Sequence, residues 1–369
     1  MLIGIDGNEA NVESKVGISE FAYRLLSEFY RKKNKDLQFE VYLKEKPNSE
    51  MPREENFWKY KIVGPKPFWT QIGLPLALFS HRQKPDIFFT PTHYAPRFSP
   101  IPTVVSVMDL SFLQFPQLFK SSDLQKLKNW TAYSVKKATK IITISQSSKD
   151  DIINEYKVAK DKVKVVYLGI KEEEKANNMT QILEKHNIKT PYVLFVGTLQ
   201  PRKNIAGLVQ AFAKVVKKNP SLTLVIIGKK GWLYDEILSA PEKFGVGKNV
   251  VFLDFVKDEE LPTFYKNAVC FVLPSLYEGF GLPVLEAMKY GCPVITSNIS
   301  SLPEAGGDAA VYVNPDSIED IAEKIEQVVG DKTLQESMRK KGLSQVKKFS
   351  WEKSAQEVLT VLQDIWKNK

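Results

Sequence analysis

Short apolar runs alternate with amphipathic stretches along nearly the whole chain, a pattern typical of β-α-β units in a mainly parallel sheet. The alternation comes in two series. The first series predicts strands at 2–5, 39–43, 87–90, 104–108, 140–144 and 163–166. The second series begins afresh and predicts strands at 192–196, 222–227, 250–253, 269–273 and 293–297. We therefore predict an α/β fold with two doubly wound sheets.

A charged segment separates the two series. Residues 171–190 are followed by Pro191 and are typical of a linker with one surface helix. The predicted domains are residues 1–172 and 173–350, since a chain of 369 residues suits two domains better than one core. The helices predicted around these strands span 17–33, 69–79, 123–138 and 145–156, and residues 317–369 are predicted to be helical throughout.

The length of one apolar stretch and the number of cysteines indicate in which cellular compartment the protein functions. The apolar stretch Ile72–Phe79 is broken by Gly73 and Pro75 and falls short of the roughly 20 residues that a membrane-spanning helix needs. The N-terminus has no basic leader, so export is not expected. Cys270 and Cys292 are too few for a disulfide framework or a zinc cluster. We expect a cytoplasmic protein with reduced thiols.

The net charge of +9 is unevenly spread. Residues 1–180 hold 28 Lys and Arg against 21 Asp and Glu. Such an excess could favour anionic lipid headgroups, nucleic acid or a phosphorylated substrate. A solvated lysine-rich surface explains it equally well.

The most informative stretch is Pro274–Ala287, which reads PSLYEGFGLPVLEA. It follows an apolar strand, turns at Gly-Phe-Gly and enters a helix at Pro283, where proline is well tolerated. Backbone N–H groups at such a turn bind phosphate, whereas carboxylates pair with vicinal hydroxyls. Glu278 in the loop and Glu286 about one turn into the helix therefore predict a sugar phosphate or a nucleotide sugar. The plain alternative is a strand-turn-helix corner with two surface glutamates.

A second strand end carries two adjacent cations. The strand at 192–196 runs into GTLQPRKN, which contains Arg202 and Lys203. Arginine grips phosphate through its planar fork and lysine acts as a point charge. Neutralising a diphosphate leaving group is what transfer from a nucleotide sugar demands. The alternative, a basic helix start, would oppose the helix dipole unless an anion were bound.

Taken in this order, these segments resemble the retaining GT-B glycosyltransferases, specifically glycosyltransferase family 4. Glu278 and Glu286 match its two-glutamate signature, and the PRKN sequence at 201–204 matches its diphosphate-binding segment. The resemblance extends over essentially the whole chain. It implies two Rossmann-like domains that face a central cleft, with the acceptor bound by the N-terminal domain and the donor by the C-terminal one. It also implies that the terminal helix, residues 351–369, crosses back to the N-terminal domain.

The resemblance implies a role for each matching residue near the two glutamates. Glu278 would contact hydroxyls of the donor sugar, and Glu286 would hold the ribose hydroxyls of the nucleotide. The backbone of Phe280, Gly281 and Leu282 would approach the sugar ring and the phosphates.

The diphosphate is assigned to Arg202 and Lys203 by the same resemblance. Gly17 matches a family glycine whose helix N-terminus faces the diphosphate from the opposite domain, although many relatives have two or more glycines there. Thr198 stands where many relatives have arginine. Arg202 and Lys203 must then carry more of the phosphate binding.

The segment before Asp109 departs from the family pattern. Met108 replaces a histidine that in many relatives lies beside the reacting sugar and faces its 6-hydroxyl. Met108 therefore suggests a 6-deoxy donor sugar, or simple drift with Asp109 or His93 filling in. His93, after a predicted strand, is placed to line the cleft. Asp109, Glu278, Arg202 and Lys203 are the residues expected to act in catalysis.

No metal and no cofactor are expected. His81, His93 and His186 do not have a metal-ligand spacing, and no Asp-X-Asp occurs. Cationic side chains should replace the divalent metal that other glycosyltransferases use.

Few residues of the sequence indicate which acceptor the protein binds. Five aromatic residues interleaved with lysines could form an interfacial surface that meets lipid headgroups, or a packed loop. They are Phe57, Trp58, Tyr60, Phe68 and Trp69.

The predicted function is a metal-independent, retaining transfer of a hexosyl group from a nucleotide diphosphate sugar to a hydroxyl of a growing glycan. Mannose or a 6-deoxyhexose and a cell-surface glycan or lipid-linked acceptor are implied by resemblance alone. The expected partners include the inner membrane surface but no nucleic acid. The alternatives are a nucleotide-sugar 2-epimerase and a catalytically degenerate nucleotide-sugar-binding protein. The dinucleotide-binding alternative fails, because no Gly-X-Gly-X-X-Gly follows the first strand.

Overall fold

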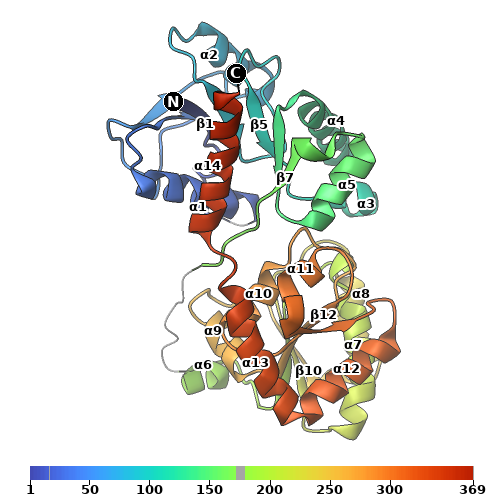
Figure 1. Cartoon of the computed structure of the whole chain (residues 1–369). Coiled ribbons are helices and arrows are strands. Elements are labelled where there is room, and N and C mark those ends of the chain that lie inside the picture. Colours follow the sequence, from blue (N-terminus) through green and yellow to red (C-terminus); the bar gives the residue numbers. More distant parts are fainter. Residues whose placement is uncertain (16, 172–178, 369) are drawn as a thin grey trace. The chain divides into compact units, whose positions relative to one another are not determined.

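The computed structural model describes residues 1–15, 17–171 and 179–368. These residues form two compact units, which can be followed along the chain in Figure 1. Unit 1 contains Met1–Gly169 together with Ser350–Lys369, and unit 2 contains Ile170–Phe349. The boundary predicted between residues 172 and 173 lies outside the described residues.

The described residues of unit 1 form a seven-stranded sheet in the order β3-β2-β1-β4-β5-β6-β7, in which the strand pairs are parallel. Its strands are β1 (Leu2–Asp6), β2 (Gln38–Leu43), β3 (Trp58–Ile62), β4 (Ile87–Thr90), β5 (Thr103–Ser106), β6 (Lys140–Thr143) and β7 (Val163–Val165). Because the chain proceeds outward from β1 in both directions, the sheet is doubly wound, as predicted.

Helices pack against this sheet. They are α1 (Ile18–Lys32), α2 (Leu74–Ser80), α3 (Ser111–Gln114), α4 (Ser121–Lys137), α5 (Gln146–Tyr156) and α14 (Trp351–Lys367), with the shorter turns η1 (Trp69–Gly73), η2 (Pro116–Leu118) and η3 (Lys160–Lys162). Helix α1 shows why they form: Phe21, Leu25 and Phe29 recur every four residues and are all buried. That stripe packs toward the sheet.

The C-terminal helix α14 belongs to unit 1, although its sequence follows unit 2. Figure 1 shows it beside α1. Ser350 caps its N-terminus by accepting a hydrogen bond from the Lys353 backbone N–H. The ring of Trp351 lies 6.3 Å from that of Phe21, and Ser354 Oγ donates to the Tyr167 carbonyl oxygen over 2.5 Å.

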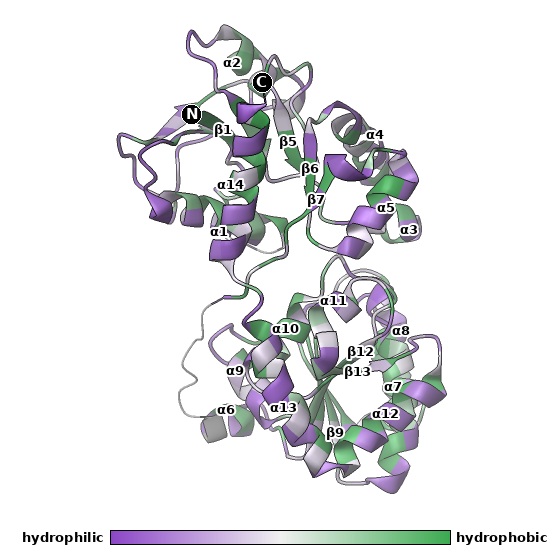
Figure 2. Ribbon diagram, viewed as in Figure 1, coloured by the Kyte–Doolittle hydropathy of each residue, from purple (hydrophilic) through white to green (hydrophobic). Residues whose placement is uncertain are grey.

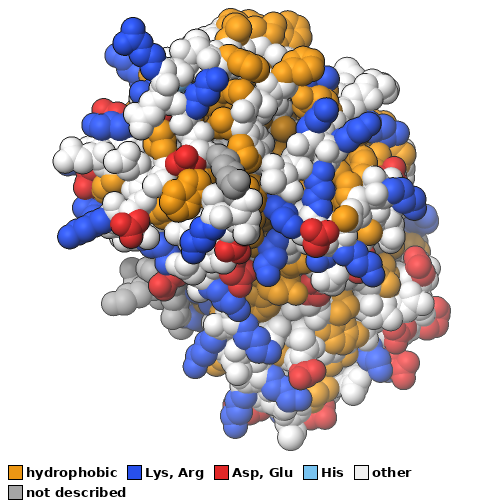
Figure 3. All heavy atoms as spheres, turned by 45° about the horizontal axis from the view of Figure 1, so that its top comes forward, with side chains coloured by type: hydrophobic (Ala, Val, Ile, Leu, Met, Phe, Trp, Pro, Cys, Tyr) orange, Lys and Arg blue, Asp and Glu red, His pale blue; other side chains and the backbone are white. Residues whose placement is uncertain are grey.

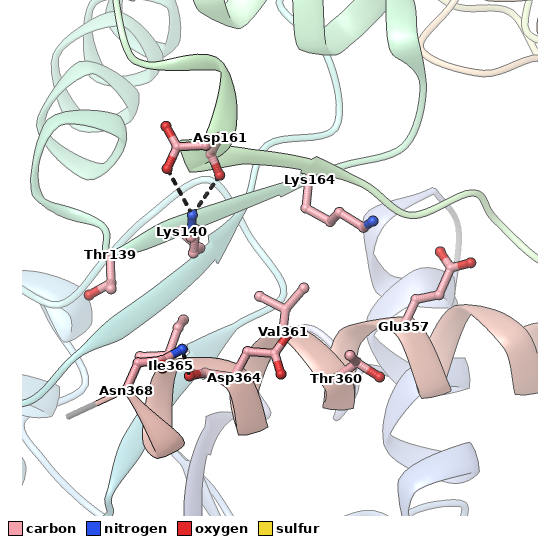
Figure 4. A pocket seen from close by; sticks show the side chains of 10 residues that line it. All are labelled: Thr139, Lys140, Asp161, Lys164, Glu357, Thr360, Val361, Asp364, Ile365 and Asn368. Atoms are coloured by element: carbon pink, nitrogen blue, oxygen red, sulfur yellow. Dashed lines mark hydrogen bonds and ion pairs between the residues drawn. The ribbon is translucent and has the colours of Figure 1, made fainter.

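A cavity of about 590 Å³ lies between α14 and the starts of β6 and β7 (Figure 4). Lys140 and Lys164 line it from the strands, and Glu357 and Asp364 line it from the helix. The Lys140 ammonium is already paired with the Asp161 carboxylate, 3.2 Å away. The cavity sits at the amino ends of the strands, whereas doubly wound sheets bind ligands at the carboxyl ends.

In unit 2 the described residues form a six-stranded sheet, also parallel, in the order β10-β9-β8-β11-β12-β13. Its strands are β8 (Tyr192–Val196), β9 (Thr223–Ile227), β10 (Val250–Leu253), β11 (Cys270–Leu273), β12 (Val294–Ser297) and β13 (Ala310–Val313). Its helices and turns are α6 (Met179–Lys185), η4 (Pro201–Lys203), α7 (Ile205–Lys218), α8 (Asp235–Lys243), η5 (Gly247–Asn249), α9 (Leu261–Asn267), α10 (Leu282–Lys289), α11 (Leu302–Gly306), η6 (Gly307–Ala309), α12 (Ile318–Gly330) and α13 (Lys332–Val346). Figure 2 shows apolar strands inside each unit and polar outer helix faces.

Two predictions about secondary structure need correction. Strands β3 and β13, at outer edges of the two sheets, were not predicted. Residues 317–369 are not helical throughout: α12 ends at Gly330, and Asp331 caps the next helix by accepting from the Leu334 backbone N–H. Residues 347–350 then separate α13 from α14.

The aromatic residues between 57 and 69 do not share one surface. Trp58 on β3 is fully buried, with its ring 5.2 Å from that of Phe39, and Trp69 is only 4% exposed. The prediction of an interfacial surface is therefore wrong for these two tryptophans, because their rings fill the core of unit 1. Phe68 differs, with 65% of its surface exposed.

Within the residues described, no helix combines the length and apolar character needed to cross a bilayer.

Candidate active site

Glu278 lies at the centre of a buried ionic cluster in unit 2. Lys203 Nζ lies 2.5 Å from its Oε1, and Arg202 Nη1 lies 3.1 Å from its Oε2. Ser275 Oγ donates to Oε1 over 2.7 Å. The exposed fractions of Glu278 and Lys203 are 7% and 8%. The sheet topology brings these side chains together, because β8 and β11 are neighbouring strands. The loop with Arg202 and Lys203 follows the carboxyl end of β8, and the loop with Glu278 follows that of β11.

Backbone contacts hold the Glu278 loop in place. Ser300 Oγ and Ser301 Oγ both donate to the Glu278 carbonyl oxygen, over 2.7 and 2.8 Å. The Glu278 backbone N–H in turn donates to Ser300 Oγ over 3.2 Å. Arg202 Nη1 also donates to the Tyr277 carbonyl oxygen. The carboxylate is therefore positioned by a neighbouring loop as well as by its own.

Two opposing effects set the pKa of Glu278. Burial alone would raise it, but the adjacent Lys203 and Arg202 outweigh burial and lower the pKa to about 2. At neutral pH the carboxylate is charged, and two cations around one carboxylate leave a net positive charge. A buried site with spare positive charge suits an anionic ligand.

Unit 2 should lose stability when the pH falls from 4.5 towards 2. The folded-state pKa of Glu278, about 2, lies below its ordinary value of 4.5. Ionised Glu278 therefore stabilises the fold above pH 4.5, and this contribution, on the order of 3 kcal/mol, is lost as the pH falls through that interval. Urea unfolding at a series of pH values should show that Glu278→Gln flattens this dependence and that Glu323→Gln, at an exposed position on α12 of the same unit, does not. An equally steep profile in Glu278→Gln would contradict the assignment.

Glu286 occupies a different environment from Glu278. It lies on α10, where burial raises its pKa, and Tyr265 Oη donates to its Oε2 over 3.3 Å. The Tyr265 ring is stacked on that of Tyr290, with centroids 5.9 Å apart. The two glutamates, eight positions apart, are thus held by separate partners, and a phenol rather than a cation lies against Glu286.

Gly281 shapes the turn between Glu278 and α10. Its φ is 104°, and an added Cβ would lie 2.9 Å from Leu302 Cδ2, so glycine is required. Helix α10 begins after it with no side-chain cap. In its first turn Pro283 has no N–H, and the Val284 N–H donates to the Gly281 carbonyl oxygen over 3.0 Å. Leu282 is the first helical residue, whereas the Phe280 side chain is buried, with its ring 5.5 Å from that of Phe349.

His93, Met108 and Asp109 meet in unit 1. They follow the carboxyl ends of β4 and β5, and His93 Nε2 accepts a hydrogen bond from the Met108 backbone N–H over 3.1 Å. Asp109 Oδ1 accepts from the Ser111 backbone N–H over 2.8 Å. Burial lowers the pKa of His93 and nearby Asp109 opposes that shift. With Nε2 accepting, the neutral ring carries its proton on Nδ1.

The two remaining predicted site residues are exposed to solvent. Thr198 is exposed in the loop after β8, and Gly17 is exposed immediately before α1 with a φ of 54°. Among the described residues of unit 2, no side-chain hydrogen bond or ion pair joins Thr198 to the cluster around Glu278. Their roles remain predictions.

Sequence reasoning missed the hydroxyl groups of this site. Ser275, Ser300, Ser301 and Tyr265 contact Glu278 or Glu286, yet none was singled out. The sequence could have indicated Ser275, which follows β11, and Ser300 and Ser301, which follow β12, because neighbouring parallel strands end at one edge of the sheet.

Across the described ranges, no group of three or more His, Cys, Asp or Glu side chains could hold a metal ion.

Comparison with known proteins identifies the family. The family model described as "Glycosyltransferase Family 4" matches residues 22–174, and that described as "Glycosyl transferases group 1" matches residues 178–345. The chain is 33% identical to O-antigen chain mannosyltransferase B of Escherichia coli over 68% of this chain and 67% of that protein. It is 28% identical to the capsular polysaccharide biosynthesis glycosyltransferase CapM of Staphylococcus aureus over 88% of each chain.

A solved structure supports the fold independently. HepE of Anabaena, in complex with UDP and glucose, matches with a TM-score of 0.74 at 18% identity, over 98% of this chain and 99% of that chain. At this identity the likeness concerns the fold alone, and it agrees with two Rossmann-like units of parallel strands. The chain therefore belongs to the group 1, family 4 glycosyltransferases, and its fold is of the GT-B type.

Proposed function

We propose that this protein moves a hexosyl group, with retention of anomeric configuration, from a nucleotide diphosphate sugar to a hydroxyl of a cell-surface glycan or glycolipid precursor. The observation that carries the proposal is the buried cluster of Arg202, Lys203 and Glu278. The names of two relatives, an O-antigen mannosyltransferase and a capsular polysaccharide enzyme, favour mannose and a polysaccharide acceptor. Met108 stands where many relatives have a histidine that faces the 6-hydroxyl of the donor sugar, so the proposed donors include 6-deoxyhexoses.

In the proposed reaction the bond between the anomeric carbon and the diphosphate breaks, and a bond to the acceptor oxygen forms on the same face. Arg202 and Lys203 receive the negative charge of the leaving group, and Glu278 accepts hydrogen bonds from sugar hydroxyls. An oxygen of the departing diphosphate takes the acceptor proton. No protein nucleophile is then required.

Retention is tested by the anomeric configuration of the product. Incubation of the purified chain with GDP-α-mannose and an acceptor glycan should give an α-linked product, read from its one-bond carbon–proton coupling. A β-linked product would overturn the mechanism. Tight donor binding without turnover would support a degenerate binding protein, and an altered nucleotide sugar without any acceptor would support an epimerase.

Metal independence forms part of the proposal, because Arg202 and Lys203 supply the positive charge that a divalent ion would provide. We expect excess EDTA to leave the transfer rate unchanged within about twofold and added Mg²⁺ to give no stimulation. The measurement is the initial rate of nucleotide release after extensive dialysis. A large loss that Mg²⁺ or Mn²⁺ restores would refute this part.

We also propose peripheral contact with the inner face of the cytoplasmic membrane. The support is an apolar face, which we call the α2 face, formed by Phe68, Ile72, Leu76 and Phe79, which are 65%, 44%, 57% and 52% exposed. Figure 3 shows hydrophobic side chains gathered at the end of unit 1 that carries α2, with Lys and Arg side chains nearby. Apolar side chains beside basic ones suit an anionic lipid surface.

The α2 face predicts a change in vesicle binding. The double variant Leu76→Ser, Phe79→Ser should lower partitioning onto phosphatidylglycerol-containing vesicles by at least about tenfold, because each side chain loses its apolar burial in lipid. Sedimentation with vesicles measures this. The control is Leu343→Ser, which replaces a 47% exposed leucine in unit 2. Equal binding of the double variant and the control would contradict the proposal.

A further inference from the structure

A second cavity in unit 1 lies at the carboxyl ends of its strands. Its volume is about 520 Å³. Asp6 ends β1, Lys44 follows β2 and Thr92 follows β4, and η1 and α4 supply further walls. Ligands of doubly wound sheets bind at this edge. In unit 2 the corresponding edge carries the Glu278 cluster, so a cavity at this edge in unit 1 is available for a second substrate.

The floor of this cavity is polar and its side chains are hydrogen-bonded to one another. Asp6 is 4% exposed, and its Oδ1 accepts from Asn8 Nδ2 over 2.6 Å while its Oδ2 accepts from Trp69 Nε1 over 3.1 Å. Asn8 Oδ1 accepts from the Lys44 backbone N–H over 2.8 Å. Oδ1 also accepts from the Asn8 backbone N–H over 3.2 Å, so Oδ2 is the carboxylate oxygen that retains a lone pair for another donor. Oriented acceptors of this kind suit the hydroxyl groups of a saccharide.

Two lysines at the cavity are held over aromatic rings. Lys126 Nζ lies 4.6 Å from the ring centroid of Trp130 and 5.9 Å from that of Tyr94, and Lys44 Nζ lies 5.8 Å from that of Trp69. In the part of the chain that the structure describes, neither ammonium group forms an ion pair with a carboxylate. Cation–π contacts fix their position without neutralising their charge. The two lysines are thus available to an anion.

We propose that this cavity binds a saccharide carrying a phosphate or diphosphate ester, with the anion at Lys44 and Lys126 and the sugar hydroxyls towards Asp6. The inference rests on the proposed function, since it names the chemical class of the acceptor. Phe68 both lines the cavity and belongs to the α2 face. A lipid attached to the phosphate would therefore leave the cavity beside the apolar side chains that we assign to the membrane.

The test compares ligands with and without phosphate. Calorimetry on the full chain would measure binding of mannobiose 1-diphosphate and of free mannobiose to the wild type and to Lys44→Ala, Lys126→Ala and Lys128→Ala. Lys128 lies on the same helix α4 but does not line the cavity, so it is the matched control. We expect the diphosphate to bind the wild type at least about tenfold more tightly than the free sugar. Lys44→Ala and Lys126→Ala should each lose about tenfold, and Lys128→Ala should lose nothing.

Equal affinity for the two ligands, or unchanged diphosphate binding in Lys44→Ala and Lys126→Ala, would overturn the inference. Turnover of nucleotide sugars in the wild type is measured in parallel. Its absence would count against the proposed function, whereas normal turnover with lysine-independent binding would count against the cavity alone.

Two sources of the phosphate ester are then separated with Phe68→Ser. If the natural ligand is lipid-linked, this variant should weaken binding of a long-chain alkyl mannobiosyl diphosphate in vesicles and leave the soluble diphosphate unaffected. If the ligand is a soluble sugar phosphate, Phe68→Ser should alter neither. Both results support recognition of the phosphate ester, and they assign its carrier.

Discussion

Replacing Lys203 with methionine should lower kcat/KM for the nucleotide sugar by about 10²- to 10³-fold, the typical cost of removing a group that stabilises developing negative charge. It should also destabilise unit 2 by about 3 kcal/mol, because Glu278 is left buried with only Arg202 as its cationic partner. Methionine retains the length and apolar stem of lysine, so the loss reports on the ammonium group. Initial rates and urea unfolding measure the two effects.

Lys214→Met is the matched control for this substitution. Lys214 lies on α7 in the same unit and pairs with Glu319 at the surface, where the side chains are 47% and 75% exposed. Exposed pairs contribute little, so neither rate nor stability should change appreciably. If Lys203→Met lost stability but kept its rate, the cluster would be structural, and the assignment of Lys203 to the diphosphate would fail.

The buried strands could be predicted from the sequence because central strands of a parallel sheet are covered on both faces and consist of continuous apolar residues. The strand at 192–196 is found as predicted, and β9, β11 and β12 differ from prediction by one residue at the start. Strand β3, WKYKI, has alternating lysines and lies at a sheet edge, where one side needs no apolar cover. Its aromatic and basic residues therefore resembled a surface segment.

The meeting of Glu278 with Arg202 and Lys203 could be predicted only in part. All three follow strand ends, and β8 and β11 proved to be neighbours, which brings the loops together. The sequence suggested that carboxylates would face hydroxyls and cations would face phosphate. Direct ion pairing depends on where the Glu278 backbone is held, and Ser300 and Ser301, from the loop after β12, determine that position. Such loop-to-loop contacts have no periodicity in the sequence.

Replacing Trp351 with alanine should lower the free energy of unfolding of unit 1 by about 3–5 kcal/mol, the usual cost of truncating a buried aromatic side chain. Trp351 is 7% exposed and packs beside Phe21, which is 2% exposed. Contact at this point is close, since a Cβ on Gly169 would lie 2.2 Å from the Trp351 backbone nitrogen. The melting temperature should fall by roughly 10 °C. Because five of the six tryptophans belong to unit 1, fluorescence follows its unfolding specifically.

Two further substitutions separate packing from other effects. Trp366→Ala truncates the same residue type on the same helix, but Trp366 is 40% exposed, so its cost should be much smaller. Trp351→Phe keeps an aromatic ring and removes an indole N–H that has no hydrogen-bond partner among the described residues, so it should retain most of the stability. If Trp351→Ala and Trp366→Ala were equally mild, α14 would not be an integral part of the unit 1 core. Residues 350–368 could then be removed with unit 1 remaining folded, whereas we expect their removal to unfold it.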